Sequence, residues 1–139
     1  MNGYLVDTNI PSGLREKPNA RVVRFLRDAG RNTVFLSVMT IGEICKGIAG
    51  LPSGQKRATL QEWLDHDPRS WFAGRVLPVT ESLAERWRQL AAAAKQRGST
   101  LAVVDGVIAA TALDHDLILI TRNLRDFADL GINSNPWEA

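Results

Sequence analysis

The sequence predicts an α/β fold in which a central parallel sheet of four to five strands lies between two layers of helices. Short apolar runs alternate along the chain with longer segments whose apolar residues recur at helical spacing. Most of these runs end in polar residues and lead directly into helix-start signals. This alternation of strand and helix is typical of a parallel sheet that is covered by helices on both faces.

The bulk properties indicate a single domain covering residues 1–139. Hydrophobic residues make up 45% of the chain and charged residues 23%, ordinary values for a globular protein. No apolar run approaches the roughly 20 residues of a membrane span, and the N-terminal residues lack the basic and apolar regions of a signal peptide. Cys45 is the only cysteine, which excludes an internal disulfide and favours the cytoplasm.

The first strand is expected at 4–6, because Tyr4-Leu5-Val6 is apolar and stops at Asp7. A helix that starts at Pro18 or Asn19 then runs to Gly30, with apolar residues on its inner face. The apolar run 34–38 predicts the second strand.

The middle of the chain is expected to hold two helices. Thr40 is predicted to cap the first helix, which closes near Gly50. The second helix covers 54–66, and we expect Asp67-Pro68-Arg69 to break it.

The last part continues the alternation. A short strand at 75–79 contains a proline and therefore belongs at an edge or an end of the sheet. Helices are predicted at about 81–97, capped by Thr80, and at 101–115, the latter largely buried. A buried strand at 117–120 and a short helix from about 124 follow. The trailing Asn135-Pro136-Trp137 is expected to pack on the core or on a partner.

The net charge of +2 is weak evidence of a nucleic-acid partner, but the basic residues are clustered. Either cluster alone is more typical of a solvated helix face than of a phosphate site. The clusters comprise Arg15, Lys17, Arg21, Arg24, Arg27 and Arg31, and then Arg86, Arg88, Lys95 and Arg97.

Two aspartates are the strongest candidates for chemistry. Asp7 follows the first strand, and ligands of open α/β folds bind beyond the carboxyl ends of strands. A single aspartate there is also common as a turn or cap residue, so alone it is a weak signal. Asp105 lies in a very apolar helix, where a carboxylate is costly to bury unless it is paired or bound to a metal. The alternative is that Asp105 caps a helix starting at Gly106.

Two further acids have equally good structural interpretations. Glu43 follows Thr40 by three residues, which is the spacing of a capping box. Asp126 follows Asn123 at the same spacing, where Asn123 can cap a helix and the acid complements its dipole.

Four converging carboxylates would repel one another, and a bound divalent cation would remove that repulsion. Mg²⁺ prefers hard oxygen ligands and uses one or two direct carboxylates. His66, His115 and Cys45 are isolated in sequence, so nothing indicates a zinc site. Phosphate-loop and serine-elbow motifs are also absent, which leaves hydrolysis by metal-activated water.

Four segments of the sequence, in this order and spacing, resemble the acidic blocks of PIN-domain nucleases, most closely the VapC toxins of toxin–antitoxin pairs, including their FitB-like branch. The resemblance covers essentially the whole chain. The segments are Leu5-Val6-Asp7-Thr8-Asn9, Ser37-Val38-Met39-Thr40-Ile41-Gly42-Glu43-Ile44, Val104-Asp105-Gly106-Val107-Ile108-Ala109-Ala110-Thr111-Ala112 and Ile120-Thr121-Arg122-Asn123-Leu124-Arg125-Asp126-Phe127.

The resemblance implies a three-layer PIN fold and an endoribonuclease that depends on Mg²⁺ or Mn²⁺. It also implies an antitoxin partner, a homodimer, and a complex with the antitoxin on operator DNA. The catalytic residues implied by the matching motifs are Asp7, Glu43, Asp105 and Asp126, with Asp7 and Asp105 as direct metal ligands.

Supporting roles are implied for Thr8 and Thr121, which would orient a carboxylate or the attacking water. Some relatives place the fourth acid at the position of Asn123, so Asn123 or Asp126, or both, would face the metal. Arg122 is expected to hold a flanking phosphate. One competing interpretation is a non-catalytic PIN-like module that binds a partner or DNA. Another is a receiver-like phospho-acceptor domain, but the strand ends of this sequence lack the lysine that receivers need.

Overall fold

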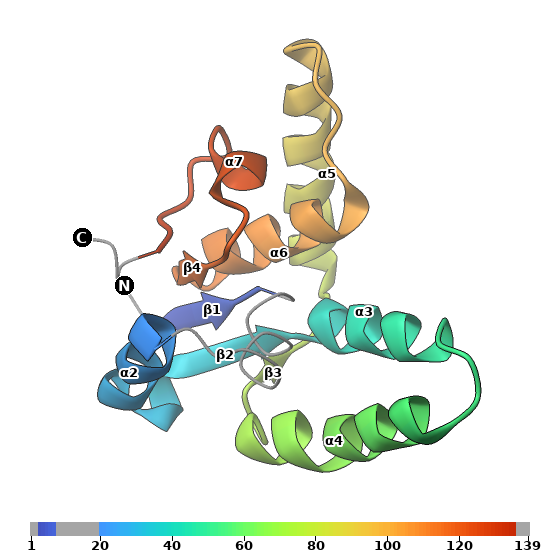
Figure 1. The fold of residues 1–139 in the computed structure, drawn as a ribbon. Helices are drawn as coiled ribbons and strands as arrows, with labels where there is room; N and C mark the ends of the chain where they lie inside the picture. Colours follow the sequence, from blue (N-terminus) through green and yellow to red (C-terminus); the bar gives the residue numbers. More distant parts are fainter. Residues whose placement is uncertain (1–2, 8–19, 136–139) are drawn as a thin grey trace.

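The structure is a computed structural model that describes residues 3–7 and 20–135, and its core is a four-stranded parallel sheet. The strands are β1 (Tyr4–Val6), β2 (Val34–Ser37), β3 (Val76–Leu77) and β4 (Ile118–Ile120), in the order β3-β2-β1-β4. β1 pairs with both β2 and β4. β3 lies at one edge, as the proline after it indicated. The predicted fold class is confirmed (Figure 1).

Helices follow the strands on both faces of this sheet (Figure 1). None of the described helices is both long enough and apolar enough to span a membrane. The helices are α2 (Ala20–Ala29), the 3-10 helix η1 (Arg31–Thr33), α3 (Val38–Ala49), α4 (Gln55–Trp71), α5 (Glu81–Gln96), α6 (Val103–Asp114) and α7 (Leu124–Phe127).

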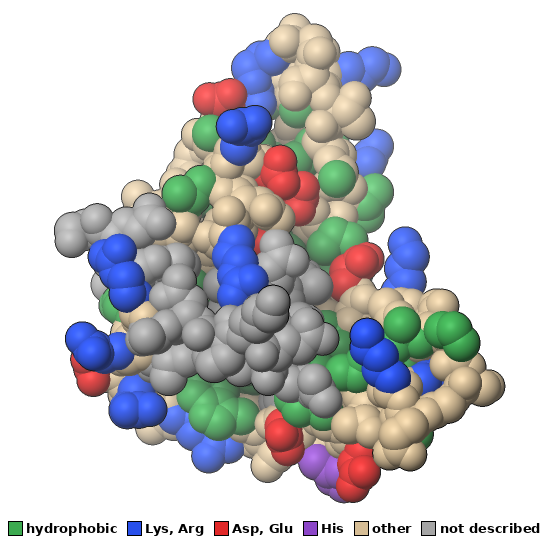
Figure 2. Space-filling view, in the orientation of Figure 1, with side chains coloured by type: hydrophobic (Ala, Val, Ile, Leu, Met, Phe, Trp, Pro, Cys, Tyr) green, Lys and Arg blue, Asp and Glu red, His purple; other side chains and the backbone are tan. Residues whose placement is uncertain are grey.

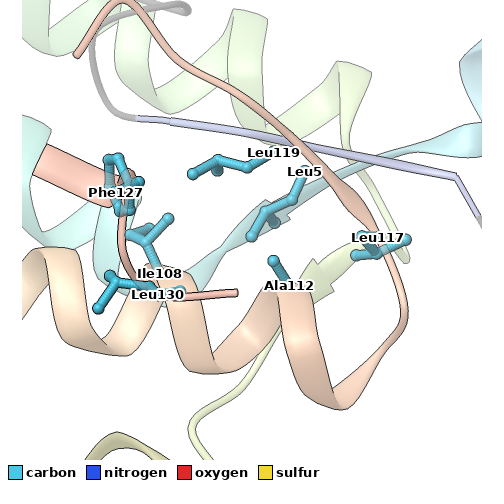
Figure 3. Close-up of a cluster of buried hydrophobic side chains, with 8 residues drawn as sticks. Leu5, Ile108, Ala112, Leu117, Leu119, Phe127 and Leu130 are labelled. Carbon is cyan, nitrogen blue, oxygen red and sulfur yellow. The ribbon is translucent and has the colours of Figure 1, made fainter. Parts of the chain in front are cut away.

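Consecutive strand residues supply the two faces, because side chains alternate along a strand. Leu5 and Leu119 point to the face covered by α6 and α7, where they pack against Ile108 and Phe127 (Figure 3). The next residue of each strand points the opposite way. Val6 belongs to a second cluster, made with α2 and the end of α4. A three-layer arrangement therefore follows from strands that are apolar on both faces.

The second cluster joins the other face of the sheet to α2 and to the residue after α4. Its members are all buried. They are Val6, Leu26, Val34, Leu36, Phe72 and Ile120.

The free edge of β4 is covered by the chain's last described residues. The amide of Leu119 donates to the carbonyl of Asn133 at 2.8 Å, and the amide of Asn135 donates to the carbonyl of Leu119 at 2.8 Å. These bonds form a parallel bridge between Leu119 and Ser134. The segment 133–135 therefore lies beside the end of β4, although the chain passes through α7 between them.

The predicted cap of α3 is wrong. The helix begins at Val38, and the hydroxyl of Ser37 accepts the amide of Met39 at 3.1 Å. Ser37 already has extended backbone as the last residue of β2, so it can cap without a linker. Thr40 lies inside the helix, fully buried, and its hydroxyl has no hydrogen-bond partner among the described residues.

The predicted break at 67–69 is also wrong, because α4 continues past Pro68 to Trp71. A proline this far into a helix cannot donate a hydrogen bond to the preceding turn and crowds it, so continuing the helix past this position has a cost. The last turn is held from outside: Arg31 donates to the carbonyls of Ser70 and Trp71, at 2.7 and 2.8 Å. Phe72 then packs into the second core cluster.

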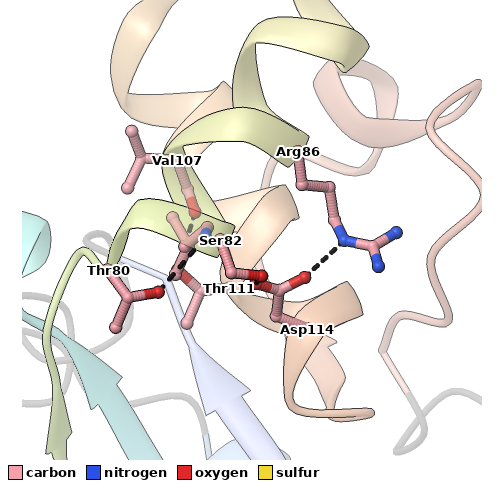
Figure 4. A network of polar contacts seen from close by, with 7 residues as sticks. Thr80, Ser82, Arg86, Val107, Thr111 and Asp114 are labelled. Carbon is pink, nitrogen blue, oxygen red and sulfur yellow. Dashed lines mark hydrogen bonds and ion pairs between the residues drawn. The ribbon is translucent and has the colours of Figure 1, made fainter.

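The cap of α5 and the burial of α6 are as predicted. Thr80 accepts the amide of Leu83 at 3.2 Å. Asp114 joins the two helices by accepting from Ser82 at 3.2 Å and from Arg86 (Figure 4). In the same view, the Thr111 hydroxyl donates to the carbonyl of Val107.

Candidate functional site

Asp7 lies at the carboxyl edge of the sheet, directly after β1, and only 4% of it is exposed. Its amide continues the ladder by donating to the carbonyl of Ile120 at 2.9 Å. The hydroxyl of Thr121, the first residue after β4, donates to Asp7 Oδ2 at 2.6 Å. Adjacent parallel strands therefore bring together two residues 114 positions apart, and the short bond is typical of a hydroxyl that donates to a carboxylate.

Asp105 reaches the same edge from α6. The helix begins at Val103 after Ala102, which makes Asp105 its third residue, so the alternative that Asp105 itself caps the helix is wrong. Burial, followed by the negative charges of Asp126 and Asp7, raises the pKa of Asp105 to about 6. Three carboxylates thus lie near enough to one another for their charges to interact.

The helix carrying Asp105 can approach α5 closely because the next residue is a glycine. A Cβ atom on Gly106 would stand 2.5 Å from Cδ1 of Trp87, which is inside any normal contact distance. Asp105 therefore supplies the negative charge at the start of α6, and Gly106 allows this part of the helix to pack closely against Trp87 of α5.

Asp126 is exposed and is the third residue of α7, as predicted. Asn123 occupies the cap position of α7, but its side chain makes no capping bond. Its amide instead donates to the hydroxyl of Thr121 at 3.0 Å. Asn123 therefore helps to orient Thr121 through its main chain.

Glu43 lies on α3, which follows β2 at the same edge and packs against α6. It is half-buried, and no hydrogen bond or ion pair of the described residues joins it to the other acids. Arg122 is exposed immediately after Thr121. Thr8, the other predicted supporting residue, lies outside the described residues.

Asn135 is buried, as expected for a tail that packs on the core, while Pro136 and Trp137 lie outside the described residues. Two features of this edge had not been predicted. The hydroxyl of Thr40 is buried without a partner in the part of the chain described, one helical turn before Glu43. Asn135 binds Thr121 from the far end of the chain: the amide of Thr121 donates to Asn135 Oδ1 at 2.8 Å. No local pattern reveals either one, because both depend on which elements meet in three dimensions.

Comparison with known proteins agrees with this geometry. The profile of the PIN domain matches residues 4–133. The chain belongs to the PIN-domain family. Its relatives include Toxin FitB of Neisseria gonorrhoeae, which is 41% identical over 136 residues, or 96% of this chain and 97% of the relative.

Two further comparisons place this PIN domain among similar proteins. VapC ribonuclease Y4jK of Sinorhizobium fredii is 34% identical over 96% of this chain and 97% of its own length. A structure of FitAB bound to an IR36 DNA fragment superposes with a TM-score of 0.84 at 38% identity, covering 96% of this chain and 95% of the other. The resemblance seen in the sequence is thereby confirmed.

The acids of this PIN domain suit a hard cation. In the part of the chain described, no three acidic, His or Cys side chains form a ready-made metal cage. Mg²⁺ does not need one, because it keeps several waters and takes one or two carboxylates. Asp7 and Asp105 supply two, and the mutual repulsion at Asp105 is what a cation would relieve. The residues therefore fit the implied metal.

The two clusters of basic side chains lie mainly on α2 and α5, helices that carry none of the site acids. On the face drawn in Figure 2, Lys and Arg cluster over α2 and towards the outer end of α5. Two members of the α5 cluster are already engaged: Arg86 pairs with Asp114, and Arg88 lies over the ring of Trp87 at 5.0 Å.

Proposed function

We propose that this PIN domain is a metal-dependent endoribonuclease that uses Mg²⁺, with Mn²⁺ as a substitute. The observation that carries the proposal is the gathering of Asp105, Asp126 and Asp7 at one edge of the sheet, where burial and like charge raise the pKa of Asp105 to about 6. Such a perturbed acid in a cluster of like charges is a mark of a functional site. RNA as the substrate is supported by the relative named a VapC ribonuclease.

Asp7 and Asp105 are the proposed metal ligands, and Glu43 and Asp126 would accept hydrogen bonds from the attacking water. A bound Mg²⁺ would supply a water of lowered pKa and would offset the charge of the scissile phosphate. Thr121 holds the Asp7 carboxylate through the 2.6 Å bond, so this ligand does not have to be ordered when the cation arrives.

The substrate would be held by cations around the acids. Arg122 is exposed directly after Thr121 and can reach a phosphate that flanks the cleaved bond. The exposed arginines of α2, with Lys95 and the following Arg97 at the outer end of α5, would add contacts that do not depend on sequence.

We further propose that the domain is the toxin of a toxin–antitoxin pair, as the relative named Toxin FitB suggests. An apolar rim supports a protein partner at this site. Among the residues whose burial is described, the exposed large hydrophobic ones lie where strands end or helices begin, at the same edge as the acids. They are Val38, Val79, Val103 and Leu124. Apolar residues around a charged centre are typical of a surface that a partner covers. A homodimer and a complex with the antitoxin on operator DNA belong to the same proposal, by analogy with FitAB on DNA.

The test is cleavage of a fluorogenic single-stranded RNA by the purified chain, with Mn²⁺ or Mg²⁺ and with EDTA. We expect cleavage that needs the cation. Asp7→Asn should reduce the rate at least about a thousandfold, because it removes a ligand carboxylate. The matched control is Asp129→Asn, which neutralises an exposed acid outside the site.

Two results would oppose the proposal. A folded Asp7→Asn protein that cleaves at the normal rate would remove Asp7 from the chemistry. A folded wild-type protein that cleaves no RNA with either cation would favour the non-catalytic module that binds a partner or DNA.

A further inference from the structure

The last described residue of the chain, Asn135, is connected to the acid site by a continuous series of hydrogen bonds. Asn135 is buried, with 7% of it exposed. Its side-chain oxygen accepts the amide of Thr121 at 2.8 Å, and the hydroxyl of Thr121 donates to Asp7 at 2.6 Å. Only one residue therefore separates the C-terminal segment from a proposed metal ligand.

The backbone of Asn135 indicates that its side chain is needed there. Its φ is 47°, in the left-handed region that glycine occupies at least cost. Asparagine tolerates this region better than most residues, but glycine would relieve more strain. What asparagine adds is an acceptor for the amide of Thr121, which is fully buried and would otherwise be left unpaired.

The main chain beside Asn135 is anchored independently of that side chain. Leu119 donates to the carbonyl of Asn133, and Asn135 donates to the carbonyl of Leu119. These two bonds hold the segment against β4, whatever side chain stands at 135. The Asn135 side chain instead binds Thr121, the first residue after β4, where the chain enters the acid site.

Thr121 is fixed on every side that the structure describes. Its amide donates to Asn135, and its hydroxyl oxygen accepts a hydrogen bond from the amide of Asn123 at 3.0 Å. The same hydroxyl donates to Asp7. A shift of the Thr121 backbone would therefore move the hydroxyl away from Asp7 Oδ2. Hydrogen bonds of 2.6 Å have little tolerance for such a shift.

We propose that Asn135 is a positioning residue of the PIN site, which fixes the Asp7 carboxylate through Thr121. The inference rests on the proposed function, because that function makes Asp7 a metal ligand. It extends the site beyond the four acidic segments to the end of the chain. Groups that orient a metal ligand without touching the metal typically contribute tenfold or more to metal affinity or activity.

The experiment compares Asn135→Gly with wild type in the full chain. Glycine keeps the left-handed backbone and removes only the acceptor. Mn²⁺ affinity is measured by electron paramagnetic resonance of the free ion, and RNA cleavage is measured for kcat and KM separately. We expect Mn²⁺ to bind about tenfold more weakly and kcat to fall about tenfold at limiting Mn²⁺, with KM for RNA changed less than twofold.

Three companion variants separate positioning from mere support of the fold. Asn133→Ala removes an exposed side chain from the same segment and should leave Mn²⁺ affinity unchanged. Asn135→Asp keeps an acceptor at the same place and should restore affinity to within about threefold of wild type. Asn135→Ser, whose oxygen is one bond too close to the backbone to reach Thr121, takes the place of Asn135→Gly if that variant does not fold.

A double variant tests the route through Thr121. In a Thr121→Val background the hydroxyl that reaches Asp7 is missing, so adding Asn135→Gly should weaken Mn²⁺ binding by less than twofold more. Equal and additive losses in both backgrounds would overturn the proposal, because Asn135 would then act by another route.

Failure of the inference can be told from failure of the proposed function. A wild-type chain that binds no Mn²⁺ and cleaves no RNA rejects both. A wild-type chain that does both, with Asn135→Gly equal to it per folded molecule, rejects only the role of Asn135. Reduced thermal stability of Asn135→Gly with unchanged Mn²⁺ affinity would likewise reduce Asn135 to a structural residue.

Discussion

The two edges of the sheet carry charge in contrasting ways. At the amino edge, Arg31 donates to the carbonyls of Ser70 and Trp71, and Arg75 donates to those of Trp71 and Val34. Both guanidinium groups also lie over the ring of Trp71, 5.7 and 5.0 Å from its centre. These cations are stabilised by groups of the chain itself.

Like charges meet at both edges, because burial and then the charge of Arg31 lower the pKa of Arg75, but at the carboxyl edge the like charges are carboxylates. The charges of Asp126 and Asp7 raise the pKa of Asp105 and so make its ionisation more costly. The hydroxyl of Thr40 is also buried without a partner in the described chain. The arginines of the amino edge are thus bound by carbonyls of the chain, whereas at the carboxyl edge the pKa of Asp105 is shifted by burial and by other acids. The difference suggests that strain is concentrated where a ligand is expected.

The first test of this contrast is Arg75→Met at the amino edge. We expect the free energy of unfolding to fall by about 2 kcal/mol, because two hydrogen bonds to carbonyls and the contact with Trp71 are lost. RNA cleavage per folded molecule should stay within twofold of wild type. Urea denaturation followed by tryptophan fluorescence measures the first effect.

Arg75→Lys is the matched control, since it keeps the charge but offers no forked donor. It should recover less than half of the lost stability. A loss of cleavage by folded Arg75→Met would break the contrast, since the amino edge would then contribute to function.

The second test is Asp105→Asn, which should stabilise the metal-free protein above pH 6. Because the pKa of Asp105 is raised from 3.8 to about 6 in the folded state, folding favours its protonated form. Wild-type stability from this group is therefore lost as the pH rises from about 4 to about 6. Asparagine avoids this loss, so we expect a gain of about 1 kcal/mol at pH 7.5, after discounting for solvent screening of the half-buried group, and none below pH 4.

Thermal unfolding in EDTA at pH 3.5, 5 and 7.5 measures this difference, with Asp129→Asn as the exposed-acid control. At pH 7.5 added Mg²⁺ should raise the melting temperature of wild type and leave that of Asp105→Asn nearly unchanged. A difference between the two proteins that is equal at all three pH values would mean that repulsion at Asp105 is not its cause.

These two edges were not equally visible in the sequence. The strands, their order of appearance and the acids after them could be predicted, because parallel strands place their carboxyl ends together and apolar runs are local signals. The arginines of the amino edge could not be assigned, because three of their four main-chain partners are carbonyls 39 to 41 residues away. Composition alone placed Arg31 in a solvated basic cluster.

The same limit explains the wrong helix boundaries. The proline at 68 is a strong local signal for a break, but the packing of Phe72 and the bonds from Arg31 hold the turn that follows it. Asn135 shows the limit at the site itself. Its partner Thr121 is 14 residues away across α7, and no spacing rule connects them.

The smallest expected effect concerns two hydroxyls at the start of α3, those of its cap Ser37 and of Thr40 inside it. Glu43 is the third residue after Thr40, a spacing that predicts a capping box, yet the cap is Ser37. Ser37→Ala should therefore cost about 1 kcal/mol, because it removes the bond to the amide of Met39. Thr40→Val should do the opposite and stabilise the metal-free protein by about 0.5–1 kcal/mol, since valine has the same shape and no buried hydroxyl to leave unpaired.

Urea denaturation of both variants in EDTA gives the two signs directly. If Thr40→Val is destabilised like Ser37→Ala, a water molecule or another unseen group satisfies the hydroxyl, and the carboxyl edge is less strained than its side chains indicate. Opposite signs would instead mean that the unpaired hydroxyl of Thr40, like the crowded carboxylates, lowers the stability of the metal-free protein. Unpaired buried polar groups and crowded charges are uncommon in folded proteins and cluster at functional sites. The presence of both at the carboxyl edge is therefore best explained by a ligand that binds there.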